Sequence, residues 1–91
     1  MVGNWILEEF KSVNLPQKLA SGFTAVTGGL VGADYQPVLY VGHQVVNGMN
    51  YCVLAIQRIT TANPDTRLVK MIINEAPNGE FSLVSVSGFA L

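Results

Sequence analysis

The residues that could carry out catalysis are few in this chain. His43 is the only histidine and Cys52 the only cysteine, and they lie on either side of an Asn-Gly turn. A nucleophile pair needs hydrogen-bond reach and an orienting third group, and no residue near them in the sequence supplies one. A metal site needs three or four ligands, so one histidine and one cysteine predict none. We therefore interpret His43 as a surface imidazole and Cys52 as a strand thiol.

The carboxylates and the glycine cluster add no catalytic signal. Glu8 and Glu9 are sequence neighbours, and Glu75 and Glu80 flank a turn. Both pairs are typical of solvated surface, although Glu75 and Glu80 could come close enough to interact. The glycine-rich stretch 28–32 superficially resembles a phosphate loop, but it follows a predicted helix and lacks the Lys-Ser/Thr pair. The sequence thus predicts a protein that is not an enzyme and uses no cofactor or metal.

Length and composition predict one compact domain over residues 1–91. The chain is 49% hydrophobic and 12% charged, with a formal net charge of −1, which argues against disorder. Its 5 Lys and Arg residues are scattered singly, so we expect no nucleic-acid partner, and no apolar run is long enough to cross a membrane. The lone cysteine predicts no internal disulfide. The absence of a signal-like start slightly favours the cytoplasm, although a removed signal would also fit.

One amphipathic helix is predicted in the first third of the chain. Asn14 is a suitable cap and Pro16 suits the first turn. The apolar stripe of a helix of roughly four turns is formed by Leu15, Leu19, Phe23, Val26 and Leu30. The helix should end at Gly28-Gly29 or at Gly32. Gly22, inside the helix, predicts close packing against a sheet.

After the helix the pattern changes to strands. The predicted strands cover 35–46, 49–60, 67–74 and 81–89, and a further edge strand is predicted within residues 1–12. The connecting turns contain Asn47-Gly48, Pro64-Asp65 and Asn78-Gly79. In an antiparallel meander the first and third turns lie at the same end of the sheet. We expect an α+β fold in which one helix packs on the concave face of an antiparallel sheet of four to five strands.

The first hairpin tip is unusually apolar. Val45 and Val46 stand at the bend, and no Asp, Glu, Lys or Arg occurs from residue 35 to residue 57. Asn-Gly is a strong hairpin signal because both residues tolerate positive φ. A tip of this kind is buried either in the rest of the protein or in a partner.

The strand that follows the tip is apolar on both faces. Residues 51, 53 and 55 alternate with residues 52, 54 and 56, and all six are apolar. Only one of these faces can cover the helix. The other is either exposed, as a patch suited to self-association, or covered by the N-terminal segment.

The stretch Gln44–Gly48, which reads Gln-Val-Val-Asn-Gly, is similar to the first inhibitory loop of the cystatin family, Gln-X-Val-X-Gly. The similarity continues into Asn50-Tyr51, a pair that often follows this loop in the family. Val2–Trp5 resembles the Gly-Gly-Trp start of plant cystatins, with Asn4 in place of the second glycine. The order of one helix and four strands also fits the family along the whole chain. The resemblance implies a cystatin-like fold.

Cystatins inhibit papain-like cysteine proteases reversibly by inserting an N-terminal arm and two hairpin loops into the active-site cleft. The resemblance therefore implies a reversible inhibitor whose partner is a papain-like cysteine protease and which occludes the cleft without catalytic groups. The protease-binding residues that it implies are Gly3, Gln44, Val45, Val46, Asn47, Gly48, Pro77 and Asn78.

The second loop departs from the usual pattern. Many cystatins have Pro-Trp there, whereas this chain has Pro77 followed by Asn78. A buried tryptophan is a frequent binding hot spot, but the stefins, which are of similar length, also lack that tryptophan and lack disulfides. The alternative reading is a cystatin-fold binding or self-associating module without protease inhibition. We expect a monomer, with a domain-swapped dimer as a second state if the hairpin opens.

Overall fold

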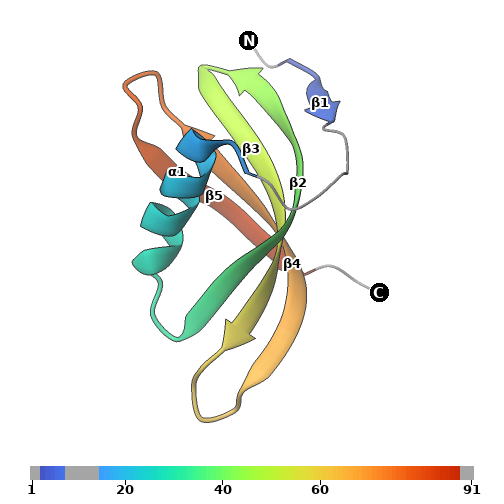
Figure 1. The fold of residues 1–91 in the computed structure, drawn as a ribbon, viewed down its shortest axis with the longest axis vertical. Coiled ribbons are helices and arrows are strands. Elements are labelled where there is room, and N and C mark those ends of the chain that lie inside the picture. Colours follow the sequence, from blue (N-terminus) through green and yellow to red (C-terminus); the bar gives the residue numbers. More distant parts are fainter. Residues whose placement is uncertain (1–2, 8–14, 89–91) are drawn as a thin grey trace.

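The computed structural model describes residues 3–7 and 15–88, which form one helix and five strands (Figure 1). In chain order the elements are β1 (Trp5–Leu7), α1 (Gln17–Gly28), β2 (Ala33–Val46), β3 (Gly48–Ile59), β4 (Asp65–Glu75) and β5 (Phe81–Gly88). The strands form one sheet in the order β1-β2-β3-β4-β5, and each neighbouring pair is antiparallel. The sheet twists around the helix, which crosses its concave face. The predicted α+β class is confirmed.

The helix begins directly after Pro16, whose carbonyl accepts a 2.8 Å hydrogen bond from the Ala20 N–H. Pro16 therefore stands at the cap and not in the first turn, and the predicted cap Asn14 lies outside the described residues. The helix ends at Gly28, so its 12 residues make only about three turns. Leu30, predicted to continue the stripe, lies beyond the helix. No helix in the described ranges is long and apolar enough to span a membrane.

The hydrophobic core lies between the helix and the sheet. Leu19 and Phe23 supply the helix side of it, as the stripe predicts. The buried core side chains are Leu19, Phe23, Tyr40, Val53, Ala55, Val69, Met71 and Ile73. Strands β3 and β4 thus supply most of the sheet side of the core.

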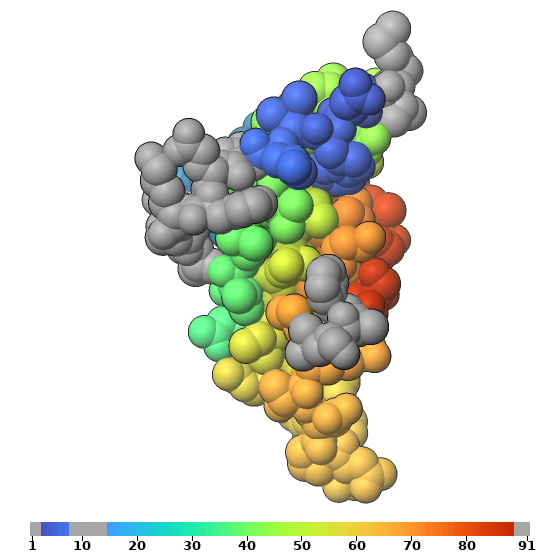
Figure 2. Space-filling view, turned by 90° about the vertical axis from the view of Figure 1, so that its right-hand side faces the viewer, coloured from blue at the N-terminus to red at the C-terminus, as the bar shows by residue number. Residues whose placement is uncertain are grey.

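The second face of β3 is only partly sheltered. Cys52 is buried on that face, whereas Leu54 and Ile56 keep some exposure. The described N-terminal strand does not cover them, because β1 pairs along the edge of β2. Figure 2 shows β1 (blue) at one end of this face. Residues 8–14 lie outside the described part of the chain.

Replacing Gly22 with alanine should destabilise the protein, even though alanine is the better helix former. A Cβ atom at Gly22 would overlap the Phe81 ring of β5, with the ring Cε1 only 2.6 Å away. Relieving such an overlap costs about 1–3 kcal/mol, whereas alanine gains about 1 kcal/mol over glycine within a helix. We expect Gly22→Ala to lower the urea midpoint of unfolding. The matched control is Gly28→Ala, where no atom lies within 4 Å of the added carbon, and equal effects of the two changes would contradict this role of Gly22.

Candidate functional site

Three segments far apart in the sequence meet at one end of the sheet, which we call the loop end (Figure 1). It carries Gly3, the tip of the β2–β3 hairpin and the β4–β5 turn. The Gly3 N–H donates a 2.8 Å hydrogen bond to the Val45 carbonyl. The two hairpins adjoin, since a Cβ atom at Gly48 would collide with the Glu75 carbonyl oxygen. The predicted meeting of the first and third turns is thus confirmed.

The first hairpin has a very tight tip. Val46 pairs with Gly48, so Asn47 alone forms the bend. Gly48 has a φ of 108°, but no residue other than glycine has a positive φ in the described part of the chain. Asn47 therefore does not use the positive φ that it could tolerate. With one residue at the bend, the turn relies on glycine alone for the left-handed step.

Half of the sequence-predicted site residues lie around one hollow. Gly3, Val45, Val46 and Asn47 line a cavity of about 350 Å³. Val45 is 53% exposed. The structure therefore places the start of the chain and the hairpin tip on a shared surface that is free of charged side chains.

The β4–β5 turn belongs to the loop end but does not line that hollow. Pro77 and Asn78 are both exposed. The turn is held by a 2.8 Å bond from the Gly79 N–H to the Ala76 carbonyl and by a 3.0 Å bond from the Glu80 N–H to the Asn78 side-chain oxygen. The second predicted loop is thus well defined and accessible.

A row of side-chain amides lies under the loop end, on the sheet face opposite the helix. Gln44, Asn50 and Asn74 are directly paired across β2, β3 and β4, and paired residues share a face. We call these three residues the amide row. Sequence reasoning placed Gln44 in the site but missed Asn50 and Asn74 as its partners, because the row exists only in the observed register.

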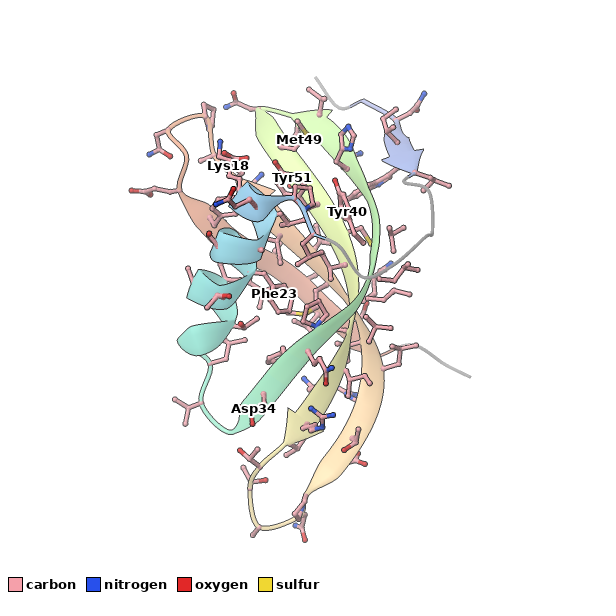
Figure 3. All side chains as sticks on the ribbon, viewed as in Figure 1. Lys18, Phe23, Asp34, Tyr40, Met49 and Tyr51 are labelled. Atoms are coloured by element: carbon pink, nitrogen blue, oxygen red, sulfur yellow. The ribbon has the colours of Figure 1, made fainter. Side chains whose placement is uncertain are left out.

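A charged cluster stabilises the loop end on the helix side of the sheet, and it consists of Lys18, Tyr51 and Glu75. The Tyr51 hydroxyl donates a 2.8 Å hydrogen bond to Glu75 Oε1, and the Lys18 ammonium pairs with the other carboxylate oxygen. Lys18, at the start of the helix, and Tyr51, on the sheet, lie near each other in Figure 3. Glu75 is only 8% exposed, so the prediction that it is a solvated surface residue is wrong: the helix supplies a cation that makes its burial tolerable.

The environment of this cluster shifts the pKa of both Glu75 and Tyr51. The Lys18 ammonium and, next, the Tyr51 hydroxyl hold the pKa of Glu75 below its usual value, against the burial that raises it. Burial, together with the hydrogen bond to Glu75 and its charge, raises the pKa of Tyr51 to about 12. At neutral pH Glu75 is therefore a carboxylate and Tyr51 a neutral phenol.

Acid unfolding should report the Glu75 ion pair. Because the pKa of Glu75 in the folded protein lies below the reference value of 4.5, its stabilisation is fully present above that value and is lost as the pH falls through the folded-state pKa. We expect the melting temperature of the parent to fall more steeply below about pH 4.5 than that of Glu75→Gln. The exposed Glu80 at the same turn provides the control Glu80→Gln, which should follow the parent. Parallel curves for the parent and Glu75→Gln would contradict the role of the pair.

The histidine and the cysteine are not brought together. His43 pairs with Tyr51, on the helix side of the sheet, whereas Cys52 pairs with Gly42 on the other side. Burial raises the pKa of the Cys52 thiol, against a smaller lowering by Lys70. Among the described residues, no group of three or more His, Cys, Asp and Glu side chains is arranged to hold a metal ion.

A scan against protein-family models finds no match. A search of curated proteins and a search of solved structures likewise find no similar chain. The fold and the site define a small α+β domain with a charge-free hairpin tip at its loop end. The function of that end is therefore inferred from its geometry together with the sequence resemblance.

Proposed function

We propose that this chain has a cystatin-like fold and is a reversible inhibitor of papain-like cysteine proteases, which it blocks by inserting the loop end into the active-site cleft. The observation that carries the proposal is the joining of Gly3 to the valine hairpin by the 2.8 Å bond between Gly3 N–H and Val45 carbonyl, with the Pro77 turn on the adjoining hairpin. These are the three segments that the family resemblance implies.

The physical properties of the loop end suit insertion into an apolar cleft. No Asp, Glu, Lys or Arg from residue 35 to residue 57 has to be desolvated when the hairpin enters a cleft. The amide row and the Glu75 cluster fix the same end from both faces of the sheet. A binding surface that is already ordered loses less conformational entropy on association. Occlusion of the cleft requires no reactive group from the inhibitor itself.

Titration of papain tests the proposal. We expect stoichiometric, reversible loss of protease activity at micromolar concentrations of the chain, with recovery on dilution. A panel of further papain-like proteases would define the target range. A folded, monomeric protein that inhibits none of the panel at these concentrations would overturn the proposal.

A second candidate is a binding or self-associating module of the same fold without inhibitory activity. It is favoured by the exposed Asn78, which stands where many cystatins place a tryptophan, and by the exposed apolar strand Trp5–Leu7. Size-exclusion chromatography before and after heating separates the two. A stable dimer with no inhibition supports the second candidate, and an inhibitory monomer supports the first.

A further inference from the structure

We propose that Asn50 and Asn74 are positioning residues: through Gln44 they hold the Gly3 segment against the first hairpin, so that both meet a protease as one preformed unit. The inference rests on the proposed function, and it assigns the two asparagines a role that the family resemblance does not imply. Neither residue belongs to the predicted protease-binding set.

The contacts form a continuous chain from β4 to the start of the molecule. Asn74 Nδ2 donates to Asn50 Oδ1 at 2.9 Å and to the Met49 carbonyl at 3.3 Å. Asn50 Nδ2 donates in turn to Gln44 Oε1 at 3.4 Å. Gln44 Nε2 then donates to the Gly3 carbonyl at 3.0 Å. Asn50 and Gln44 each accept a hydrogen bond through the amide oxygen and donate one through the amide nitrogen, so donation runs in one direction from Asn74 to Gly3.

Gly3 makes one hydrogen bond through its N–H and one through its carbonyl, and the second depends on this series of side-chain hydrogen bonds. Its N–H is bound to the Val45 carbonyl, a backbone contact that any residue of the hairpin could provide. Its carbonyl accepts a hydrogen bond from the Gln44 side chain, which has free rotamers unless its other end is fixed. Asn50 fixes the Gln44 oxygen, and Asn74, near the end of β4, fixes Asn50. Residues up to two strands away therefore fix the contact to the Gly3 carbonyl, in addition to the backbone contacts that β1 and the Gly3 N–H make with β2.

The functional consequence follows from the cost of ordering a flexible arm. A Gly3 segment that is already ordered beside the Val45-Val46 tip loses less conformational entropy when it enters a cleft. The amide row is only partly buried, so its loss should loosen the arm without unfolding the core. If the two asparagines served only the stability of the fold, replacing them would lower the melting temperature. The Gly3 amide would then not exchange faster relative to the amides of the core.

Hydrogen exchange on the free, full-length protein tests the holding of the arm. Asn74→Leu keeps the approximate size of the side chain and removes both donated hydrogen bonds. We expect the Gly3 amide to exchange about fivefold faster, as for the loss of one hydrogen bond, while the amides of β4 keep their rates. Ser82→Ala changes the residue paired with Asn74 on β5 but removes none of the hydrogen bonds that link the amide row to Gly3, and should leave Gly3 unchanged. Asn50→Ala provides a second variant should Asn74→Leu fail to fold.

A double-mutant cycle tests whether the row acts as one chain. Gln44→Leu alone should release Gly3, and adding Asn74→Leu to it should give no further acceleration. Additive effects would show that Asn74 acts on Gly3 by another route, which would overturn the inference.

Papain inhibition by the same variants connects the arm to function. We expect Asn74→Leu to weaken inhibition about fivefold and Ser82→Ala to leave it unchanged. Faster Gly3 exchange with unchanged inhibition, or unchanged Gly3 exchange in both asparagine variants, overturns the inference while the proposed function stands. Absence of inhibition by the parent overturns the proposed function, and the Gly3 exchange rates then still decide whether the amide row holds the arm.

Discussion

Val46→Asp should weaken the inhibition of papain at least about a hundredfold while the domain stays folded. Val46 lines the hollow of the loop end together with Gly3 and Asn47. Insertion of this tip into a cleft would remove the new carboxylate from water with no cation beside it, a cost of several kcal/mol. Every 1.4 kcal/mol, roughly, is a tenfold change in affinity. The inhibition constant from a papain titration, with the melting temperature as a check on folding, measures the effect.

The matched control is the same substitution at the far end of the molecule. Val31 lies between α1 and β2 and is 100% exposed. Val31→Asp adds the same charge to the same kind of residue, and it should leave inhibition unchanged. If Val46→Asp inhibited as well as Val31→Asp, the β2–β3 hairpin would not be the inserted segment.

Gly48→Ala should be among the most destabilising single changes in this chain. Gly48 has a φ of 108°, which an alanine adopts only with strain. An added Cβ would also collide with the Glu75 carbonyl oxygen and lie 3.3 Å from the Ala76 Cα. Strain and overlap together should cost about 2–4 kcal/mol. For a domain of this size the melting temperature should fall by at least about 8 °C, which differential scanning calorimetry would detect.

Gly79 provides a comparison that separates the two causes. It has a φ of 90°, but no atom lies within 4 Å of its Cβ position. Gly79→Ala should therefore show only the backbone strain, about 1–2 kcal/mol. The difference between the two variants measures how closely the β2–β3 hairpin approaches β4. Equal losses would show that this approach does not constrain the loop end.

The parts of the fold that could be predicted from the sequence are those encoded by local periodicity and turn chemistry. The stripe through Leu19 and Phe23 identified the buried face of the helix, and Asn47-Gly48 identified the position of the hairpin. The register at its tip differs from that of a two-residue turn, because Val46 pairs with Gly48. Local signals do not encode register shifts within a strand. The shifts between Pro37 and Leu39 and between Tyr40 and Gly42 were therefore not predicted.

The sequence identified the residues of the candidate site but not the contacts that hold them in place. The Gln44–Gly48 stretch, Gly3 and Pro77 were implied by the family resemblance, and connectivity predicted that the first and third turns lie at one end of the sheet. The bracing of that end depends on contacts between residues far apart in the sequence. Glu75 looked like a solvated turn residue because its partner Lys18 lies on the helix. The partnership of Asn50 with Asn74 appears only when β3 and β4 are aligned residue by residue.

The shape of the molecule separates its loop end from the connection between β3 and β4. Residues 60–64 are all exposed, and they form the opposite tip of a molecule whose longest dimension is 42 Å (Figure 2). Exposed loop tips of this kind tolerate insertions well. A fluorophore, a surface tether or a fused protein attached there would leave the valine hairpin accessible. The β3–β4 connection is therefore a suitable attachment site for immobilising this protein.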